Sequence, residues 1–308
     1  MGIGKLYIEV SSVCNLKCKM CFRNSWFDEV PTLMSDATID RIKNTISDDN
    51  FKSVFFGGMG EPLLHNRIFE LIKLSKDHNK QAELITNATL LTEDISKKLV
   101  ECGIDTLWIS MDGFTKESYE AIRKGSLYQK ITDNIKYFNS IKGNIKLGLT
   151  FVMMNENLAE LDEINDFADK YGFDYINLSH VVPCEELKKE NSIYDLNYRV
   201  GKMHRFSKSE NYIKQLDYCP FIGDEVCFIR SDGEVCPCMQ LLHSSYSYLY
   251  GEKRKIYSYS FGNINEQSLS EIYNSNEYVQ FRKKVKNFEF PCCTDCLGCE
   301  DRKENLTD

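Results

Sequence analysis

Near its start the chain reads Leu6-Tyr-Ile-Glu-Val-Ser-Ser-Val-Cys14-Asn-Leu-Lys-Cys18-Lys-Met-Cys21, a short apolar run followed by three cysteines. The run Leu6–Val10 has the composition of a β-strand. Three thiolates within eight residues can hold three corners of an iron–sulfur cube and leave the fourth iron open to a small molecule. Zinc is the alternative, but a structural zinc site needs a fourth Cys or His, and none lies nearby in the sequence. The spacing therefore favours a cluster with one open iron.

The overall composition narrows the classes of function. The chain has 308 residues, 13 of them cysteine, with 27% charged and 42% hydrophobic residues. It shows no apolar leader and no run near the ~18 residues that cross a membrane. We therefore expect a cytoplasmic protein without membrane contact, in which clustered thiols bind metal rather than form disulfides. The 38 Lys and Arg against 46 Asp and Glu, without a long basic block, argue against extended nucleic acid as a partner.

Short β-rich runs alternate with amphipathic stretches through the first part of the chain. The predicted strands are Leu6–Val10, Ser53–Phe56, Glu83–Thr86, Thr106–Ser110, Lys146–Val152 and Tyr175–Leu178. The predicted helices are Ser35–Ile46, Ile68–Lys76, Thr92–Cys102, Ser118–Arg123, Gln129–Ile141 and Leu158–Tyr171. Ser35 and Thr92 are suited to cap their helices, and Gly103 and Gly172 stand where a helix ends.

This alternation predicts an α/β fold with a parallel sheet, because parallel neighbours need crossover connections. A partial β/α barrel and a doubly wound sheet fit the pattern equally well. In both, functional residues gather at the carboxyl ends of the strands. A polar stretch near residues 200–217 predicts a boundary, which divides the chain into a body of residues 1–205 and a cysteine-rich region of residues 206–308.

The spacing C-x3-C-x2-C, with Met20 before its last cysteine, resembles the signature of the radical S-adenosylmethionine (SAM) superfamily. After the second predicted strand comes Phe56-Gly57-Gly58-Met59-Gly60-Glu61-Pro62, which is similar to the glycine-rich acidic motif of that family. The resemblance implies that backbone and carboxyl oxygens here meet the ammonium of SAM, and glycine permits such close approach. The inserted Met59-Gly60 departs from the commonest form of the motif, so either Glu61 or a backbone carbonyl could make the contact.

Further matches fall at the ends of the next strands. Thr86-Asn87 closes the third strand and Ser110-Met111-Asp112 closes the fourth, where the resemblance implies polar contacts to the ribose or methionyl group of SAM. Arg123 resembles an arginine that pairs with the SAM carboxylate, a task suited to guanidinium. The family fold implied is a partial (β/α)6 TIM-like barrel.

The last third of the chain is similar to the SPASM-type module that holds auxiliary iron–sulfur clusters. Cys219, thirteen residues, Gly233, four residues and Cys238 match its opening, and Asp232-Gly233 predicts a hairpin turn between Val226–Arg230 and Glu234–Cys236. The segment Phe261-Gly-Asn-Ile264 and a predicted helix Ser268–Lys284 also resemble it. The expected ligands are Cys219, Cys227 and Cys238 for one cluster and Cys293, Cys296 and Cys299 for another, with Cys236 and Cys292 as possible fourth ligands.

The module departs from its family after Cys299, where the usual final cysteines are missing. The number of auxiliary clusters, one or two, is therefore left open, and a zinc ribbon is the alternative for the whole region. Cys184 follows the sixth predicted strand and is a candidate donor of a hydrogen atom or proton to a substrate radical. The tyrosine-rich stretch from His243 to Tyr259, with Lys253-Arg254-Lys255, is either a surface hairpin or a lid over an anionic substrate.

The resemblance supplies a reaction. A reduced [4Fe-4S] cluster on Cys14, Cys18 and Cys21 would cleave SAM to a 5′-deoxyadenosyl radical that abstracts hydrogen from a substrate. An electron donor such as a reductase, ferredoxin or flavodoxin is implied. The motifs look most like maturases associated with tungsten-cofactor oxidoreductases, with a metallopterin or its host enzyme as substrate. Two alternatives are a maturase that modifies a peptide or protein and a non-catalytic iron–sulfur scaffold.

Overall fold

The computed structural model describes residues 2–27, 29–48, 51–181, 219–249 and 252–287. The predicted boundary near residues 205 and 206 lies outside the described residues. So do five of the cysteines singled out above, Cys184, Cys292, Cys293, Cys296 and Cys299.

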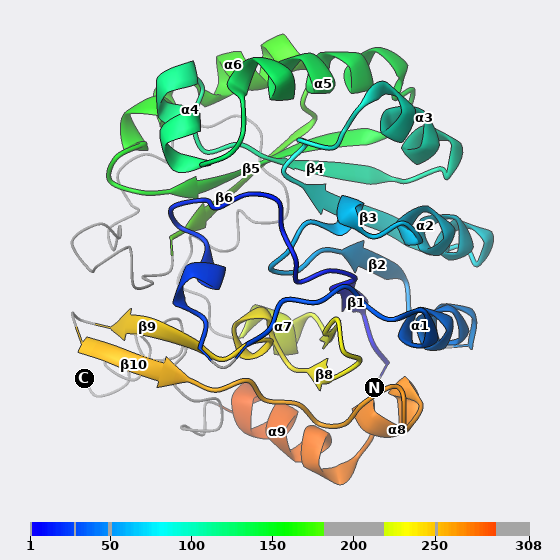
Figure 1. Ribbon diagram of the computed structural model, residues 1–308. Helices are drawn as coiled ribbons and strands as arrows, with labels where there is room; N and C mark the ends of the chain where they lie inside the picture. The colour runs from blue at the N-terminus through cyan, green and yellow to red at the C-terminus, as the bar shows by residue number, and fades with distance from the viewer. Residues whose placement is uncertain (1, 28, 49–50, 182–218, 250–251, 288–308) are drawn as a thin grey trace.

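Six parallel strands form the body of the molecule (Figure 1). They are β1 (Lys5–Ile8), β2 (Ser53–Phe56), β3 (Gln81–Thr86), β4 (Thr106–Ser110), β5 (Lys146–Met153) and β6 (Tyr175–His180). They lie in chain order from β1 to β6, without the reversal that defines a doubly wound sheet. The prediction of an α/β barrel is therefore confirmed and the doubly wound alternative is wrong.

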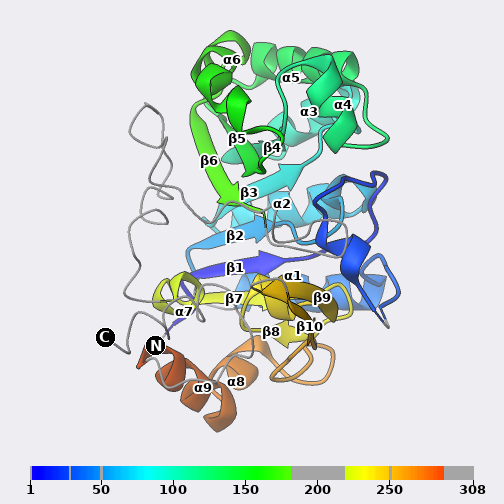
Figure 2. The same cartoon turned by 90° about the vertical axis from the view of Figure 1, so that its left-hand side faces the viewer.

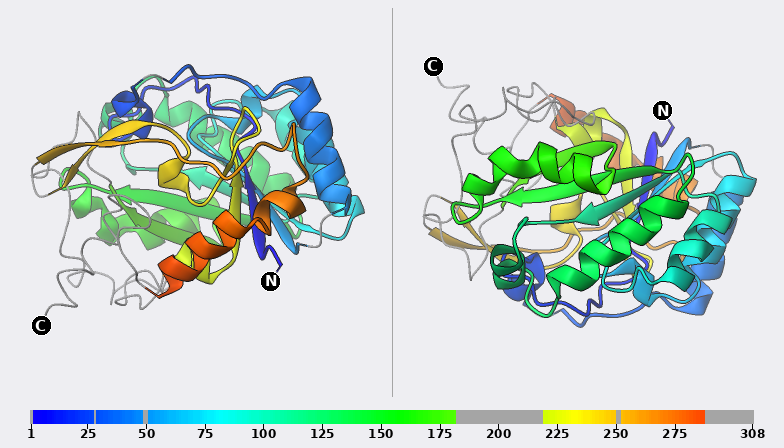
Figure 3. Two further views of the ribbon diagram at one scale, coloured as in Figure 1. Left: turned by 90° about the horizontal axis from the view of Figure 1, so that it is seen from below. Right: turned by 90° about the horizontal axis from the view of Figure 1, so that it is seen from above.

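The crossover helices pack on the outer side of this arc of strands (Figures 1 and 3). They are α1 (Asp36–Asp48), α2 (Ile68–Asp77), α3 (Glu93–Glu101), α4 (Lys116–Ile122), α5 (Tyr128–Ile141) and α6 (Ile164–Tyr171). Ser35 and Thr92 accept hydrogen bonds from Thr38 N and Ile95 N, so both predicted caps are confirmed. Gly172 ends α6 in the left-handed conformation, with φ of 72°.

Two predicted helices are interrupted in the structure. The stretch predicted as one helix from Leu158 begins as the 3-10 helix η3 (Leu158–Glu163), and only then continues as α6. The stretch predicted as Ser268–Lys284 divides into α8 (Leu269–Tyr273) and α9 (Asn276–Lys286). Ser275 accepts a hydrogen bond from Tyr278 N and so starts α9 as a new helix.

The sheet continues from the barrel into the cysteine-rich region. Strand β7 (Val226–Ile229) pairs in parallel with β1, and β8 (Val235–Cys236) pairs antiparallel with β7. The order of the eight-stranded sheet is β6-β5-β4-β3-β2-β1-β7-β8. The predicted hairpin around Asp232-Gly233 is confirmed, and Gly233 has a φ of 93° that favours glycine. Pairing with β7 covers the edge of β1 that the barrel alone would leave open.

A short helix precedes β7 and a second hairpin follows β8 (Figure 2). The helix α7 (Pro220–Gly223) begins directly after Cys219. The 3-10 helix η7 (Met239–Leu241) follows Cys238 and leads to β9 (Ser245–Leu249) and β10 (Glu252–Ile256). The tyrosine-rich stretch therefore forms a hairpin, as one of the two interpretations predicted.

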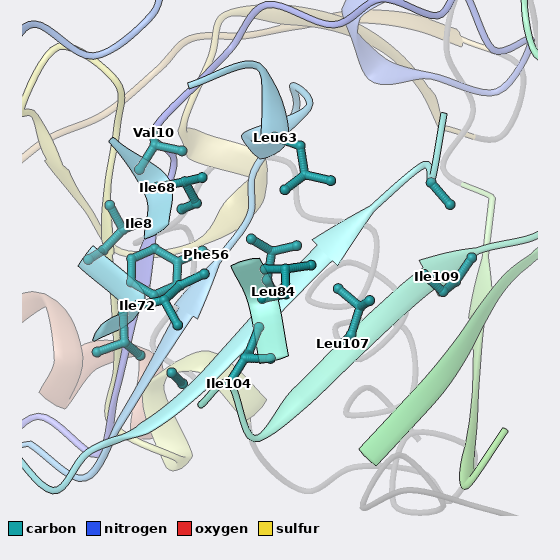
Figure 4. Close-up of a cluster of buried hydrophobic side chains, with 14 of the residues drawn as sticks. Ile8, Val10, Phe56, Leu63, Ile68, Ile72, Leu84, Ile104, Leu107 and Ile109 are labelled. Carbon is teal, nitrogen blue, oxygen red and sulfur yellow. The ribbon is translucent and has the colours of Figure 1, made fainter. Parts of the chain in front are cut away.

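The core of the barrel lies between the strands and their helices. Figure 4 shows Ile8, Phe56 and Leu84 from successive strands packed with Ile68 and Ile72 of α2, and all five side chains are fully buried. Each such side chain stabilises the fold by about 1.5–3 kcal/mol relative to an exposed position. This core holds the strand ends in fixed register, and the chemistry-bearing loops extend from those ends.

Candidate active site at the carboxyl edge of the sheet

The cysteine loop follows β1 and is held against the end of α4. Lys17 N donates to Lys124 O at 3.0 Å, and Lys19 N donates to Ile122 O at 2.8 Å. Cys21 ends the loop and occupies the N-cap position of η1 (Phe22–Ser25). These backbone bonds place the loop beside Arg123, which is the C-cap residue of α4.

The three thiols share one apolar cluster. Cys18 is buried with Leu16, Met20, Ile122, Met154 and Val181, and Cys14 and Cys21 pack against the same cluster. Burial raises the pKa of the Cys18 thiol to about 11, and the neighbouring Arg123 cation opposes that rise. Burial also raises the pKa of Cys21. Thiols in such surroundings need a bound cation to become thiolates, as iron would provide.

Arg123 and Asp112 form a buried ion pair next to the thiols. Arg123 Nη2 lies 2.6 Å from Asp112 Oδ2, and the two side chains are 8% and 0% exposed. Asp112 Oδ1 accepts a hydrogen bond of 2.8 Å from Val152 N. Arg123 Nε is buried and has no hydrogen-bond partner in the part of the chain that the structure describes. The guanidinium therefore keeps one donor that a carboxylate ligand could accept from.

The glycine-rich loop after β2 packs directly on the first strand and the cysteine loop. Glu61 N donates to Val13 O at 2.8 Å. A Cβ on Gly60 would lie 2.5 Å from Val13 O, and one on Gly58 would lie 2.5 Å from Glu9 Cγ. Side chains at these positions would push the two loops apart. Glycine is thus required at position 60 because this loop packs on the backbone of the cysteine loop, and at position 58 because it packs on the side chain of Glu9.

Glu61 joins this loop to the end of β3. Its Oε1 accepts from Thr86 Oγ1 at 2.7 Å and from Leu63 N at 3.1 Å, and its Oε2 accepts from Asn87 N at 2.8 Å. The side chain is 2% exposed, and burial raises its pKa to about 6 against the opposing effect of these hydrogen bonds. Both carboxylate oxygens are therefore already bound within the protein.

Asn87 and Ser110 lie at the ends of their strands, as predicted. Asn87 Nδ2 donates to Asn15 Oδ1 at 3.0 Å and lies 3.7 Å from Cys14 Sγ, so it holds the cysteine loop. Ser110 Oγ lies 3.4 Å from Thr150 Oγ1 and remains half-buried. The structure thus brings the predicted residues of four consecutive strand ends to one edge of the sheet.

These residues fit an iron–sulfur cluster with SAM beside it. In the described part of the chain, no three His, Cys, Asp or Glu side chains converge as they would on a single metal ion. A tetrahedral zinc site would need thiolates about 4 Å apart, given Zn–S bonds near 2.3 Å. A cubane binds each thiolate to a different iron and suits thiols that share a pocket without converging. The available donor of Arg123 is the matching anchor for a carboxylate.

Comparison with known families decides the assignment. Residues 8–168 match the model of the radical SAM superfamily, and residues 219–300 match that of the SPASM iron–sulfur cluster-binding domain. The chain belongs to the radical SAM superfamily. Members of this superfamily bind a [4Fe-4S] cluster and SAM. The SPASM domain of this chain is a further site for iron–sulfur clusters. Radical SAM enzymes also require a reductant and act on a substrate.

Two relatives match this radical SAM protein over much of its length. A tungsten-containing aldehyde ferredoxin oxidoreductase cofactor-modifying protein of Pyrococcus furiosus is 33% identical over 94% of this chain and 86% of its own. A probable GTP 3′,8-cyclase of Methanococcus maripaludis is 29% identical over 74% of this chain and 76% of its own. The first match spans both the barrel and the SPASM domain.

Solved structures share the fold at lower identity. Streptococcus suis SuiB bound to S-adenosylmethionine superposes with a TM-score of 0.69 at 19% identity, over 91% of this chain and 68% of that one. Native anSMEcpe with bound AdoMet gives a TM-score of 0.68 at 22% identity, over 92% and 84% of the two chains. Both confirm the expected barrel and SPASM architecture. No helix in the described part of this radical SAM protein has the length and apolar character to cross a membrane.

The described SPASM cysteines lie on and around the β7–β8 ribbon. Cys227 is fully buried in the main core, and Tyr278 Oη lies 4.0 Å from its sulfur. Cys236 pairs in register with Phe228, the neighbour of Cys227, and packs in a separate apolar cluster with Phe228. Because side chains alternate along a strand, Cys227 and Cys236 project from opposite faces of the ribbon. Cys219 and Cys238 flank the ribbon just before α7 and η7.

The structure also shows a polar cluster that was not predicted. Glu9 at the end of β1 and His243 after η7 are 1% and 5% exposed, and Glu9 Oε2 lies 2.8 Å from His243 Nε2. His243 Nδ1 lies 3.1 Å from Glu29 Oε2. A carboxylate inside the apolar run Leu6–Val10 was the signal in the sequence, because buried carboxylates need partners.

Proposed function

We propose that this radical SAM protein cleaves SAM reductively and uses the resulting radical to modify a metallopterin cofactor or the tungsten oxidoreductase that holds it. One observation carries this proposal. The match to the cofactor-modifying protein of Pyrococcus furiosus covers 94% of this chain at 33% identity and includes both domains. A shared substrate class is the expected consequence of such a full-length match.

Cys14, Cys18 and Cys21 are the proposed ligands of the catalytic cluster. When bound, the cluster supplies the electron that cleaves SAM, and SAM supplies the fragment that abstracts hydrogen. The chain's own residues hold and orient these groups. The loop that carries the thiols is fixed by backbone bonds from Lys17 and Lys19 to the end of α4. Its apolar surroundings exclude water from the reacting atoms.

SAM is proposed to lie across the strand ends next to this cluster. Arg123, oriented by Asp112, would bind its carboxylate with the Nε that has no hydrogen-bond partner among the described residues. Backbone carbonyls of the loop Gly57–Gly60 would accept from its ammonium, since both oxygens of Glu61 already bind within the protein. Ser110 would contact the ribose or methionyl group of SAM.

The auxiliary sites and partners form a second part of the proposal. Residues 1–205 would act as the barrel and residues 206–308 as the SPASM unit, with Cys219, Cys227 and Cys238 on one cluster. Cys293, Cys296 and Cys299 would hold a further cluster, with Cys236 and Cys292 as candidate fourth ligands. A reductase, ferredoxin or flavodoxin of the reduced cytoplasm would deliver the electron. Cys184 remains a proposed donor to the substrate radical.

The substrate proposal is tested by adding candidate substrates to the reduced enzyme under anaerobic conditions. A tungsten oxidoreductase carrying its pterin cofactor should increase formation of 5′-deoxyadenosine and undergo a mass change in the cofactor or the protein. A control with C14A/C18A/C21A protein should leave the substrate unchanged. Stimulation by a short peptide, with the oxidoreductase unchanged, would instead establish the peptide-maturase alternative. Absence of 5′-deoxyadenosine under all conditions, with clusters intact, would establish the scaffold alternative.

A further inference from the structure

The polar cluster around His243 connects the SPASM domain with the barrel. His243 lies between two carboxylates, Glu9 on one side at 2.8 Å and Glu29 on the other at 3.1 Å. The ring of Trp26 stacks on its imidazole at a centroid distance of 4.1 Å. Three contacts thus fix a side chain that is 5% exposed.

Glu9 links His243 to the glycine-rich loop. Its second oxygen, Oε1, accepts a hydrogen bond of 2.8 Å from Met59 N. A Cβ on Gly58 would lie 2.5 Å from Glu9 Cγ, so the loop rests on the stem of this side chain. The position of Gly58 and Met59 therefore depends on where Glu9 is held, and His243 holds its other oxygen.

Glu29 and Trp26 link His243 to the segment that follows the cysteine loop. Ser244 N donates to Glu29 Oε1 at 2.7 Å, and Phe27 N donates to Ser244 O at 3.2 Å. Trp26 also forms an antiparallel bridge with Ser245. This segment begins at η1, whose N-cap position Cys21 occupies. One histidine of the SPASM domain thus contacts supports of both the glycine-rich loop and the cysteine loop.

The charges explain why histidine is suited to this place. A neutral imidazole has one N–H donor, whereas an imidazolium has two and can donate to Glu9 and Glu29 at once. Burial disfavours the cation, but hydrogen bonds and charge from the two carboxylates outweigh burial and raise the pKa of His243 above its ordinary value of 6.5. A hydrogen bond between charged groups is stronger than one between neutral groups, so the two bonds from His243 hold Glu9 and Glu29 firmly in place.

We propose that His243 is a positioning residue for SAM, which through Glu9 sets the glycine-rich loop and through Glu29 and Trp26 sets the loop of the catalytic cluster. The SPASM domain then contributes to SAM binding as well as holding clusters. This inference depends on the proposed assignment of residues 57–60 to SAM. It predicts that the bridge matters for the affinity for SAM more than for the turnover of bound SAM.

The test uses the full-length, anaerobically reconstituted protein. The substitutions His243→Gln and Glu9→Gln approximately keep side-chain size. His243→Gln leaves one of the two carboxylates poorly paired, and Glu9→Gln leaves one donor of His243 poorly paired. Each should raise the KM for SAM by roughly tenfold, the factor expected for one charged hydrogen bond. The kcat for 5′-deoxyadenosine at saturating SAM should change less than KM. The electron paramagnetic resonance change that SAM causes in the reduced cluster should need correspondingly more SAM.

The double variant and a matched histidine complete the design. Because Glu9 and His243 act through one bond, the double variant should be no worse than either single variant. His65→Gln is the control, since His65 is 4% exposed and contacts Met34 O at 2.9 Å within the barrel. Wild-type KM and spectra in His243→Gln, multiplicative losses in the double variant, or equal losses in His65→Gln would overturn the proposal. A wild-type protein without any SAM-induced spectral change would refute the proposed function instead.

Discussion

Arg123 is the residue on which the cofactor assignment depends most, because it is a buried cation with an available donor. Its partner Asp112 is fully buried, and burial raises the pKa of that carboxyl while Arg123 lowers it. Removing the guanidinium would leave a buried carboxylate without its counter-ion, which costs about 3–5 kcal/mol of stability. Lysine keeps the charge but lacks the Nε donor that Arg123 offers beside Asp112.

We therefore expect Arg123→Lys to fold and to bind SAM about tenfold more weakly than the wild type, because one charged hydrogen bond is lost. Isothermal titration of SAM into the anaerobic protein measures this. Arg67→Lys is a matched control, since Arg67 pairs with Asp36, Asp40 and Glu70 on the outer face. Unchanged affinity in Arg123→Lys would show that this side chain does not hold the SAM carboxylate.

His243 makes the stability of the protein dependent on pH. The pKa of His243 is raised in the folded state, so the folded protein binds this proton more tightly than the unfolded chain. The stabilisation is complete below the ordinary value of 6.5 and is lost as pH rises through the raised pKa of the folded state. The free energy of unfolding by urea should therefore fall as pH rises above 6.5 by more in the wild type than in His243→Gln. Parallel pH profiles for the two proteins would contradict this.

At the scale of elements, the alternation of side chains along β7 and β8 places Cys227 and Cys236 on opposite faces of the ribbon. Cys227 faces Tyr278 in the main core, whereas Cys236 lies in the cluster with Phe228 on the other face. If Cys227 shares a cluster with Cys219 and Cys238, replacing Cys227 and replacing Cys236 should change the iron content differently. With Cys292 rather than Cys236 as the fourth ligand, Cys227→Ala should lose about four irons per chain and Cys236→Ala should keep them. Iron analysis after anaerobic reconstitution measures this, and equal losses in the two variants would argue against the partition.

The strands were predicted accurately from the local sequence pattern. The interruptions of the helices were not predicted. The strands Ser53–Phe56 and Thr106–Ser110 begin and end where predicted. The break between α8 and α9 was missed because Ser275 caps a new helix within a stretch whose apolar spacing looks continuous. Capping by one serine competes with helix continuation, and the rings of Tyr273 and Tyr278 pack edge to face across the break.

At the scale of the whole molecule, the candidate site was predictable because parallel strands end at one edge. The loops after β1, β2, β3 and β4 all carried recognisable residues, and the topology brings them together. The pairing of β1 with β7 was not predictable, since Lys5 and Val226 are partners from distant parts of the chain and no local signal encodes that register. The same long-range packing creates the contact between Glu9 and His243, which the sequence therefore could not reveal.

The continuous sheet also gives the SPASM domain a fixed relation to the site. Strand β7 is bonded along β1, whose end leads directly into Glu9 and the cysteine loop. The turn after η7 then returns to Glu9 through His243. If His243 positions the glycine-rich loop as proposed, both domains contribute to the catalytic site, and we expect weaker SAM binding when the contact between them is lost.

Reductive cleavage of SAM is tested most directly by 5′-deoxyadenosine formation by the full-length, reconstituted protein with SAM and dithionite. We expect nucleoside from the wild type and none from C14A/C18A/C21A, while the variant keeps the iron bound in its SPASM domain. Wild-type protein with a full complement of iron that yields no 5′-deoxyadenosine would contradict SAM cleavage at this site, as would a triple variant that still forms it.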